Sequence, residues 1–172
     1  LGKTLQTIAH LLLEKQADRL SLPALIVAPT SLVGNWRSEL LRFAPDLRTL
    51  VLHGQDRHGE FARVADHDVV ITTYPLLLRD EEVLTQQPWS VLVLDEAQAI
   101  KNAKTRLAST VLQLVAQQRL CLTGTPMENH LGEIWSLFHF LMPGYLGTET
   151  RFKQLFRTPI EKHGDRQRLA LF

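Results

Sequence analysis

The sequence contains a single cysteine, no long apolar run and almost no net charge. One cysteine, Cys121, excludes an internal disulfide framework and fits a reducing compartment. No apolar run approaches the ~20 residues that a membrane-spanning helix needs, so no membrane partner is expected. The net charge of +1 gives no overall field that would attract nucleic acid. Any such binding must therefore come from local patches.

Signals for metal clusters and for targeting are also missing. The seven histidines show no spacing typical of metal ligands, and with one cysteine a zinc site is not expected. The chain starts Leu1-Gly2-Lys3-Thr4, without a methionine or a signal-peptide pattern, which indicates a segment of something longer. Its 172 residues, 45% of them hydrophobic, are enough for about one globular domain with a sizeable core.

Two adjacent carboxylates follow a strongly apolar strand candidate. Val91–Leu94 predicts a strand buried on both faces, and Asp95 and Glu96 come directly after it. Unpaired buried charge is costly, but strand ends in an open α/β sheet are where ligands bind. Two acids there suit magnesium-assisted phosphoryl transfer, in which one holds the metal and its water shell and the other activates the attacking water. The alternative is that Asp95 caps a following helix.

The start of the chain carries part of a phosphate-binding pattern. Gly2-Lys3-Thr4 precedes apolar residues at helical spacing, and it corresponds to the last three positions of a G-x-x-x-x-G-K-[ST] loop. The amides at a helix start can cradle phosphate, which Lys3 would then reach while Thr4 ligates magnesium. An ordinary solvated helix start is the alternative.

Short apolar strands alternate with helical patterns along the chain. This order predicts an α/β fold, a three-layer parallel sheet with helices on both faces. Right-handed crossovers then place the strand ends at Ala28, Thr73, Asp95 and Thr123 on one edge of the sheet. The predicted strands are 24–28, 49–52, 69–73, 91–94 and 119–123, and the predicted helices are 5–12, 32–43, 56–65, a leucine-rich segment after Pro75, 105–115 and 134–141.

The remaining features each have a structural and a functional interpretation. Thr123–Asn129 places hydroxyls, a glycine and a proline at the predicted edge, although a plain turn has the same composition. From Arg151 onward six basic residues face two acidic ones, which favours either a solvated face or a contact with a phosphate backbone. Core packing is the better interpretation of Cys121 and of the three tryptophans, Trp36, Trp89 and Trp135.

Five blocks of the sequence resemble the first lobe of Swi/Snf-type motors, the double-stranded-DNA-translocating ATPases of helicase superfamily two. The combination of DEAxxIKN with TGTPxxN is highly specific, and the order and spacing match the family along most of the chain. RNA helicases of the superfamily usually carry Ser-Ala-Thr at the position of Thr123–Thr125. The blocks are LGKT at 1–4, IVAPTSLVGNW at 26–36, ITTY at 71–74, LVLDEAQAIKN at 92–102 and LTGTPMEN at 122–129.

The resemblance implies a RecA-like P-loop NTPase lobe that uses ATP and Mg²⁺. Its catalytic residues would be Lys3 at the phosphates, Asp95 at the metal and Glu96 at the attacking water. Gly2 would share the nucleotide contact, and Thr4 would be the second magnesium ligand.

Further residues would couple the nucleotide site to DNA. Gln98 stands where many members of the family have histidine, and it would contact the nucleotide site and bridge it to the Thr123-Gly124-Thr125 loop. Phosphate contacts fix a protein on DNA without reading its sequence, which suits a motor that moves along any DNA. The DNA-facing residues would be Pro29, Thr30, Ser31, Thr73, Thr125 and Asn129.

The same resemblance sets the expected domain limits and partners. Residues 1–144 would be the lobe without its start, and 145–172, with FKQLFRTPIE at 152–161, the beginning of a helical insertion, so that the fold is truncated at both ends. The partners would be double-stranded DNA, a second RecA-like lobe of the same protein and a DNA-bound protein. The second lobe supplies arginine fingers, typically worth ~10³–10⁵ in rate, so the isolated chain is expected to hydrolyse ATP negligibly.

Other functions remain open at this point. The chain could be a non-catalytic DNA- or protein-binding module, or a lobe of a related restriction-type or RNA helicase motor. A Swi/Snf-type motor would work in the nucleoid region of a prokaryotic cytoplasm or in a eukaryotic nucleus.

Overall fold

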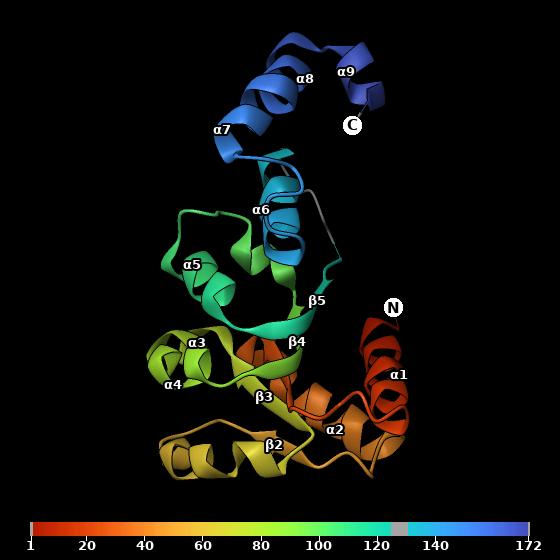
Figure 1. Ribbon diagram of the computed structural model, residues 1–172, viewed down its shortest axis with the longest axis vertical. Coiled ribbons are helices and arrows are strands. Elements are labelled where there is room, and N and C mark those ends of the chain that lie inside the picture. The colour runs from red at the N-terminus through yellow and green to blue at the C-terminus, as the bar shows by residue number, and fades with distance from the viewer. Residues whose placement is uncertain (1, 125–130, 172) are drawn as a thin grey trace.

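A parallel five-stranded sheet forms the centre of the molecule. The computed structural model describes residues 2–124 and 131–171, and the strands run side by side in the order β2-β3-β1-β4-β5 (Figure 1). All four neighbouring pairs are parallel, which confirms the predicted α/β class. The strand bounds are Ala24–Ala28 for β1, Thr49–Val51 for β2, Val69–Thr73 for β3, Trp89–Asp95 for β4 and Ala116–Leu122 for β5.

Helices cover both faces of this sheet, because successive side chains of each strand point to opposite sides. On one face Val91 and Val93 of β4 pack with residues of α1 (Lys3–Gln16) and α2 (Val33–Phe43). On the other face Leu92 and Leu94 pack with α3 (Tyr74–Arg79), α4 (Glu81–Gln86), α5 (Arg106–Gln113) and α6 (Leu131–Leu141). The predicted three layers are therefore present.

Shorter helical segments join these elements. The predicted helix at 56–65 is a run of 3₁₀ turns, η2 (Asp56–Asp66). It is held to the body by the buried Arg57, whose guanidinium pairs with Asp80 at 2.7 Å and also donates to the Gly54 carbonyl. Two more 3₁₀ segments follow strands, η1 (Thr30–Leu32) after β1 and η3 (Ala97–Ile100) after β4.

The strand β5 begins three residues earlier than the sequence pattern predicts. Its first half is polar, which hides it from an apolar pattern, and polar contacts hold it to the helices on both faces. Gln118 bonds His10 and Glu14 of α1 at 2.9 and 3.0 Å. On the opposite face Arg119 donates to the carbonyls of Leu114 at 3.0 Å and Phe140 at 2.9 Å, at the ends of α5 and α6.

The C-terminal helices extend beyond α6 at one end of the molecule (Figure 1). They are α7 (Glu149–Phe152), the π-helical η4 (Lys153–Arg157), α8 (Thr158–His163) and α9 (Arg166–Leu171). The helix α6 belongs to both parts, because its Leu137 and Phe140 pack in the sheet core while its Leu131 and Trp135 pack against Phe152. The predicted domain limit at residue 144 stays a prediction.

The structure also bears on two smaller expectations. Trp36, Trp89 and Trp135 are 0%, 1% and 6% exposed, which confirms their assignment to cores. Within residues 2–124 and 131–171, no helix is long and apolar enough to cross a membrane.

Candidate active site at the carboxyl edge of the sheet

The ends of four strands meet at one edge of the sheet, as the alternating pattern predicts. Ala28 lies beside Thr73 in the register of β1 and β3, and Asp95 lies beside Leu122 in that of β4 and β5. Thr123 follows Leu122 directly. This edge therefore brings together segments from four distant parts of the chain.

Asp95 is a buried carboxylate fixed by two donors. It is 6% exposed, and its Oδ2 accepts the indole N–H of Trp36 at 2.8 Å. Its Oδ1 accepts the backbone N–H of Glu96 at 2.9 Å. The N-cap of η3 is Glu96 and has no side-chain cap bond. The alternative in which Asp95 serves as a helix cap is therefore not what the structure shows.

The tyrosine of the ITTY block holds the same strand end through its backbone. The hydroxyl of Tyr74, a residue that is 8% exposed, donates to the Asp95 carbonyl at 2.6 Å. Burial raises the pKa of Tyr74 well above its usual range, so the hydroxyl keeps its proton and remains a donor. Sequence reasoning missed both Trp36 and Tyr74 as partners of Asp95. Their residue types could have indicated this role, because a buried indole or phenol group usually has a hydrogen-bond partner.

Glu96 differs from its neighbour in backbone and in exposure. Its φ of 48° and ψ of 56° lie in the left-handed region, which is unfavourable for a residue with a side chain. This turn leaves the side chain 34% exposed at the sheet edge, where Oε1 lies 3.6 Å from the Lys3 ammonium. The second oxygen, Oε2, accepts the Gln98 amide N–H at 2.7 Å. Asp95 and Glu96 thus present one fixed and one accessible carboxylate.

Gln98 continues the contacts from Glu96 to the end of β5. Its Oε1 accepts the Thr123 hydroxyl proton at 2.9 Å. The next residue, Gly124, lies close to Lys3, since a Cβ placed on it would be 4.0 Å from the lysine nitrogen. Lys3, Glu96, Gln98 and Thr123 therefore form one chain of polar contacts from α1 to the end of β5. Their roles as nucleotide-binding, catalytic and coupling residues remain predictions.

Gly2 and Thr4 flank Lys3 at the start of α1. Gly2 is exposed and has a φ of 86°, a conformation that glycine adopts without steric cost. Its carbonyl accepts the Gln6 N–H at 3.0 Å, and Thr4 is partly exposed. Leu1, the first residue of the LGKT block, lies outside the described residues.

The oxygen groups at this edge fit a magnesium ion shared with a nucleotide. Each oxygen of Asp95 accepts one hydrogen bond and retains a free lone pair. Mg²⁺ prefers oxygen ligands and is usually bound by one or two protein groups together with phosphates and water. The described part of the chain has no cluster of three or more His, Cys, Asp or Glu side chains that could enclose a metal. Asp95 and Thr4 therefore suit a Mg²⁺ ion that is also coordinated by phosphates and water, rather than one enclosed by protein ligands alone.

The predicted DNA-facing residues differ in how accessible they are. Thr30 and Ser31 are exposed in η1, and Pro29 is half-buried. Thr73 lies at the same edge but is only 1% exposed, and its hydroxyl accepts the Leu76 N–H at 3.4 Å as the cap of α3. Its hydroxyl is thus already engaged. The other two predicted contacts, Thr125 and Asn129, lie outside the described residues.

A cavity of about 310 Å³ opens beside these residues. Thr30 and Thr73 line it together with His53 and Arg79. Both of the latter side chains are exposed, and sequence reasoning assigned no role to either. Their basic character is visible in the sequence, but their placement beside Thr30 depends on the order of the strands.

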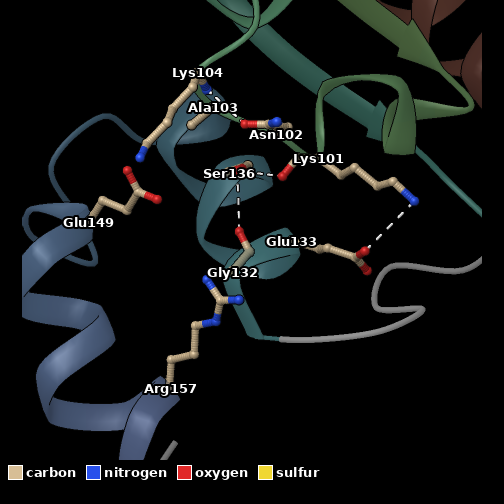
Figure 2. Close-up of a pocket in the computed structure, with 9 residues that line it drawn as sticks. All are labelled: Lys101, Asn102, Ala103, Lys104, Gly132, Glu133, Ser136, Glu149 and Arg157. Atoms are coloured by element: carbon tan, nitrogen blue, oxygen red, sulfur yellow. Dashed lines mark hydrogen bonds and ion pairs between the residues drawn. The ribbon is translucent and has the colours of Figure 1, made fainter. Parts of the chain in front are cut away.

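A second cavity, of about 470 Å³, lies where the lobe meets the C-terminal helices (Figure 2). Lys101 and Asn102, the last residues of the DEAQAIKN block, line one side of it, and Glu149 and Arg157 come from the C-terminal helices. The Ser136 hydroxyl of α6 donates to the Lys101 carbonyl at 2.9 Å. The end of the block thus fastens α6, and the cavity walls carry charges of both signs.

The basic character of the C-terminal helices is reduced by internal pairs. Arg157 lies 3.1 Å from Glu161, and Arg168 lies 3.4 Å from Asp165. These are the two acidic residues that the sequence sets against six basic ones. Two of the six positive charges are therefore neutralised locally, and the open choice between a solvated face and a DNA contact concerns the remaining four.

Comparisons of the sequence and of the structure with known proteins both find SNF2-family proteins. The chain matches the SNF2-related domain over residues 1–171. It is 45% identical to the "Putative ATP-dependent helicase/translocase YwqA" of Bacillus subtilis (strain 168), with 99% of the chain and 19% of that protein covered. It is 39% identical to the TATA-binding protein-associated factor MOT1 of Saccharomyces cerevisiae, with 93% and 9% covered. The chain thus spans less than a fifth of either relative.

A solved structure has the same fold. The Sulfolobus solfataricus SWI2/SNF2 ATPase core in complex with dsDNA superposes with a TM-score of 0.90 at 43% identity, covering 99% of this chain and 36% of that one. The parallel five-stranded sheet flanked by helices matches the fold of that ATPase core. The chain belongs to the SNF2-related domain family, and its fold is that of the N-terminal lobe of a SWI2/SNF2 ATPase core.

Proposed function

We propose that this chain is the N-terminal motor lobe of a double-stranded-DNA translocase, coupling Mg-ATP hydrolysis to movement on DNA or displacement of bound proteins. The observation that carries the proposal is the unbroken contact chain from Lys3 through Glu96 and Gln98 to Thr123. It joins the start of α1, where the phosphates would bind, to Thr123 directly after β5. Membership of the SNF2-related family supports ATP as the nucleotide.

The chemistry is divided between the two carboxylates. Bound Mg²⁺ would neutralise charge on the ATP phosphates, and the fixed oxygens of Asp95 with the Thr4 hydroxyl would hold it. Gly2 and Lys3 would bind the phosphates. Because Lys3 lies 3.6 Å from Glu96, its attraction to the phosphates would release Glu96 to accept a proton from the attacking water.

Gln98 couples this chemistry to DNA in the proposed mechanism. It holds Glu96 with its amide nitrogen and Thr123 with its amide oxygen, so a shift of one displaces the other. Gly124 and Thr125 would carry that displacement into the following loop. A glutamine can do this without a histidine because its amide has both a donor and an acceptor.

DNA would lie along the edge formed by η1 and the 310 Å³ cavity. The exposed Thr30 and Ser31, with Pro29, would contact phosphates, and Thr125 and Asn129 would add contacts from the following loop. His53 supplies a ring N–H donor at the cavity, and Arg79 supplies positive charge. The Thr73 hydroxyl already caps α3, so Thr73 would support the DNA-binding edge by positioning that helix and would not contact DNA with its hydroxyl.

The proposal requires partners outside this chain. A second RecA-like lobe would supply the arginine fingers, so residues 1–172 alone are expected to hydrolyse ATP negligibly. A DNA-bound protein would be the load. The site of action would be the nucleoid region of a prokaryotic cytoplasm or a eukaryotic nucleus. Magnesium-dependent, DNA-stimulated turnover by the isolated chain at the rate of the full-length protein would contradict the need for the second lobe.

ATPase assays of the full-length protein test the nucleic-acid class. The expected result is a low basal rate, strong stimulation by double-stranded DNA and weaker stimulation by single-stranded DNA. Phosphate release is measured with equal nucleotide concentrations of double-stranded DNA, single-stranded DNA and RNA. Stimulation by RNA alone would overturn the proposal, and the absence of phosphate release under every condition would favour the non-catalytic DNA- or protein-binding module.

A further inference from the structure

We propose that Trp36 is a positioning residue for Asp95, and that it links this carboxylate to the DNA-facing segment 29–31. The inference rests on the proposed function, in which Asp95 is a magnesium ligand. It assigns to the Trp36 indole N–H a task that core packing alone does not require.

The hydrogen bond sets the orientation of the carboxylate. Trp36 is 0% exposed and Asp95 is 6% exposed, so the 2.8 Å bond between them is shielded from water. A hydrogen bond to an ionised group is stronger than a neutral one, and a low-dielectric surrounding strengthens it further. With the Glu96 amide on Oδ1 and the indole on Oδ2, rotation of the carboxylate about its Cβ–Cγ bond would break both contacts.

The other tryptophans show that packing does not dictate such a bond. The Trp89 indole donates to the Leu84 carbonyl at 3.1 Å, and the Trp135 indole donates to the Gly147 carbonyl at 3.2 Å. Both acceptors are neutral backbone groups of neighbouring loops and helices. Of the three tryptophans in the chain, only Trp36 donates to a carboxylate, and it does so across 59 residues of sequence.

The position of Trp36 joins two functional segments. The helix α2 begins at Val33, directly after η1 (Thr30–Leu32), and the Leu32 N–H bonds the Pro29 carbonyl at 2.9 Å. Residues 29–36 therefore form one continuous, hydrogen-bonded run, with the exposed Thr30 and Ser31 at its start and the indole near its end. DNA bound at that start would hold the indole in place, and with it the orientation of the Asp95 carboxylate.

Replacement of the indole by a phenyl ring separates the hydrogen bond from the packing. Trp36→Phe in the full-length protein removes the donor and keeps an aromatic ring, and Trp89→Phe is the matched control with an equally buried tryptophan. Calorimetric binding of a non-hydrolysable ATP analogue is measured over a range of Mg²⁺ concentrations, so that no turnover is needed. Partners that orient metal ligands are typically worth 10–100-fold, so Trp36→Phe should raise the Mg²⁺ requirement about 10-fold, while Trp89→Phe leaves it unchanged.

DNA dependence provides the second readout. In steady-state assays Trp36→Phe should lower kcat more than the KM for ATP rises, and it should reduce the ratio of DNA-stimulated to basal rate. Trp36→His, which retains a ring N–H, should recover part of the Mg²⁺ affinity. Equal Mg²⁺ dependence in Trp36→Phe and Trp89→Phe would overturn the inference. An Asp95→Asn variant with unchanged Mg²⁺ dependence would instead overturn the proposed function.

Hydrogen exchange of the wild-type protein tests the link if Trp36→Phe does not fold. Adding Mg²⁺ and the ATP analogue should slow amide exchange in residues 33–40 of α2, although that helix is not part of the proposed nucleotide site. Residues 81–86 of α4 provide the control and should not change. Unchanged exchange in residues 33–40 would overturn the proposed link between Asp95 and α2.

Discussion

The strands β4 and β5 end side by side at the candidate site, yet they are held in different ways. All seven residues of β4 are buried, whereas none of the seven residues of β5 is. Apolar packing on both faces fixes β4, and polar contacts through Gln118 and Arg119 hold much of β5. The end that carries Asp95 is therefore more deeply buried than the end that precedes Thr123.

This difference suits the two tasks proposed for the edge. A metal ligand and a general base have to keep one geometry, because small displacements reduce the rate greatly. A coupling segment has to move when DNA binds. Gln98 contacts both ends, with one hydrogen bond to Glu96 and one to Thr123.

The largest expected effect comes from the accessible carboxylate of β4. Glu96→Gln removes the general base and should lower turnover by ~10²–10⁴-fold. Binding of ATP should persist, because Asp95 and Lys3 remain. The assay compares phosphate release and nucleotide binding in the full-length protein, with Glu82→Gln on the exposed surface of α4 as the control. A Glu96→Gln variant with the wild-type rate would remove Glu96 from the reaction.

The stability difference between the strands can be measured directly. Leu94→Ala leaves a cavity in the core and should cost ~2–5 kcal/mol of the free energy of unfolding. The matched change on β5, Leu122→Ala, acts on a partly exposed side chain and should cost about 1 kcal/mol. Urea unfolding gives both values if the two variants keep the same m-value. Equal losses would show that β5 is as firmly packed as β4.

A third change breaks the connection between the strand ends. Gln98→Ala removes hydrogen bonds to Glu96 and Thr123. At ~1 kcal/mol for each, the ratio of DNA-stimulated to basal ATPase rate should fall about 30-fold. Gln98→His can restore one or both contacts and should retain most of the stimulation. Gln113→Ala on the exposed side of α5 is the control. Full stimulation in Gln98→Ala would show that coupling bypasses this residue.

The smallest effect on function is expected at Cys121 of β5. Partial burial raises the pKa of its thiol to about 12, so at neutral pH almost none of it is the reactive thiolate. Alkylating reagents should modify it slowly, the rate should increase with pH, and Cys121→Ser should leave ATPase activity close to that of the wild type. Rapid labelling at neutral pH would indicate that β5 opens readily.

Features that depend on neighbouring residues in the sequence are predicted correctly, whereas contacts between residues far apart in the sequence are not. The apolar run before Asp95 predicts β4 and places both acids at its end, and the alternation of elements predicts the edge where they lie. The start of β5 was missed because Gln118 is polar, and its partners on α1 lie more than 100 residues away. Local pattern contains no information about such a partner.

The candidate site shows the same limit. Asp95 accepts the indole N–H of Trp36, and this contact depends on the packing of α2 against the sheet. The buried state of Thr73 likewise follows from the start of α3, which its hydroxyl caps. The sequence predicts the residue types of the candidate site. Only the three-dimensional packing shows which of their oxygen atoms already accept hydrogen bonds within the protein.

The helix α6 packs against both the sheet core and the C-terminal helices, and this affects where the chain can be shortened. Leu131 and Trp135 are 5% and 6% exposed, and they pack against Phe152, Phe156 and Ile160 of the C-terminal helices. Cutting the chain after residue 144 would leave this apolar surface in contact with water, at a cost of roughly 25 cal/mol for each Å² uncovered. A shortened protein ending there would therefore tend to aggregate during expression, whereas one that retains residues 145–171 keeps α6 covered.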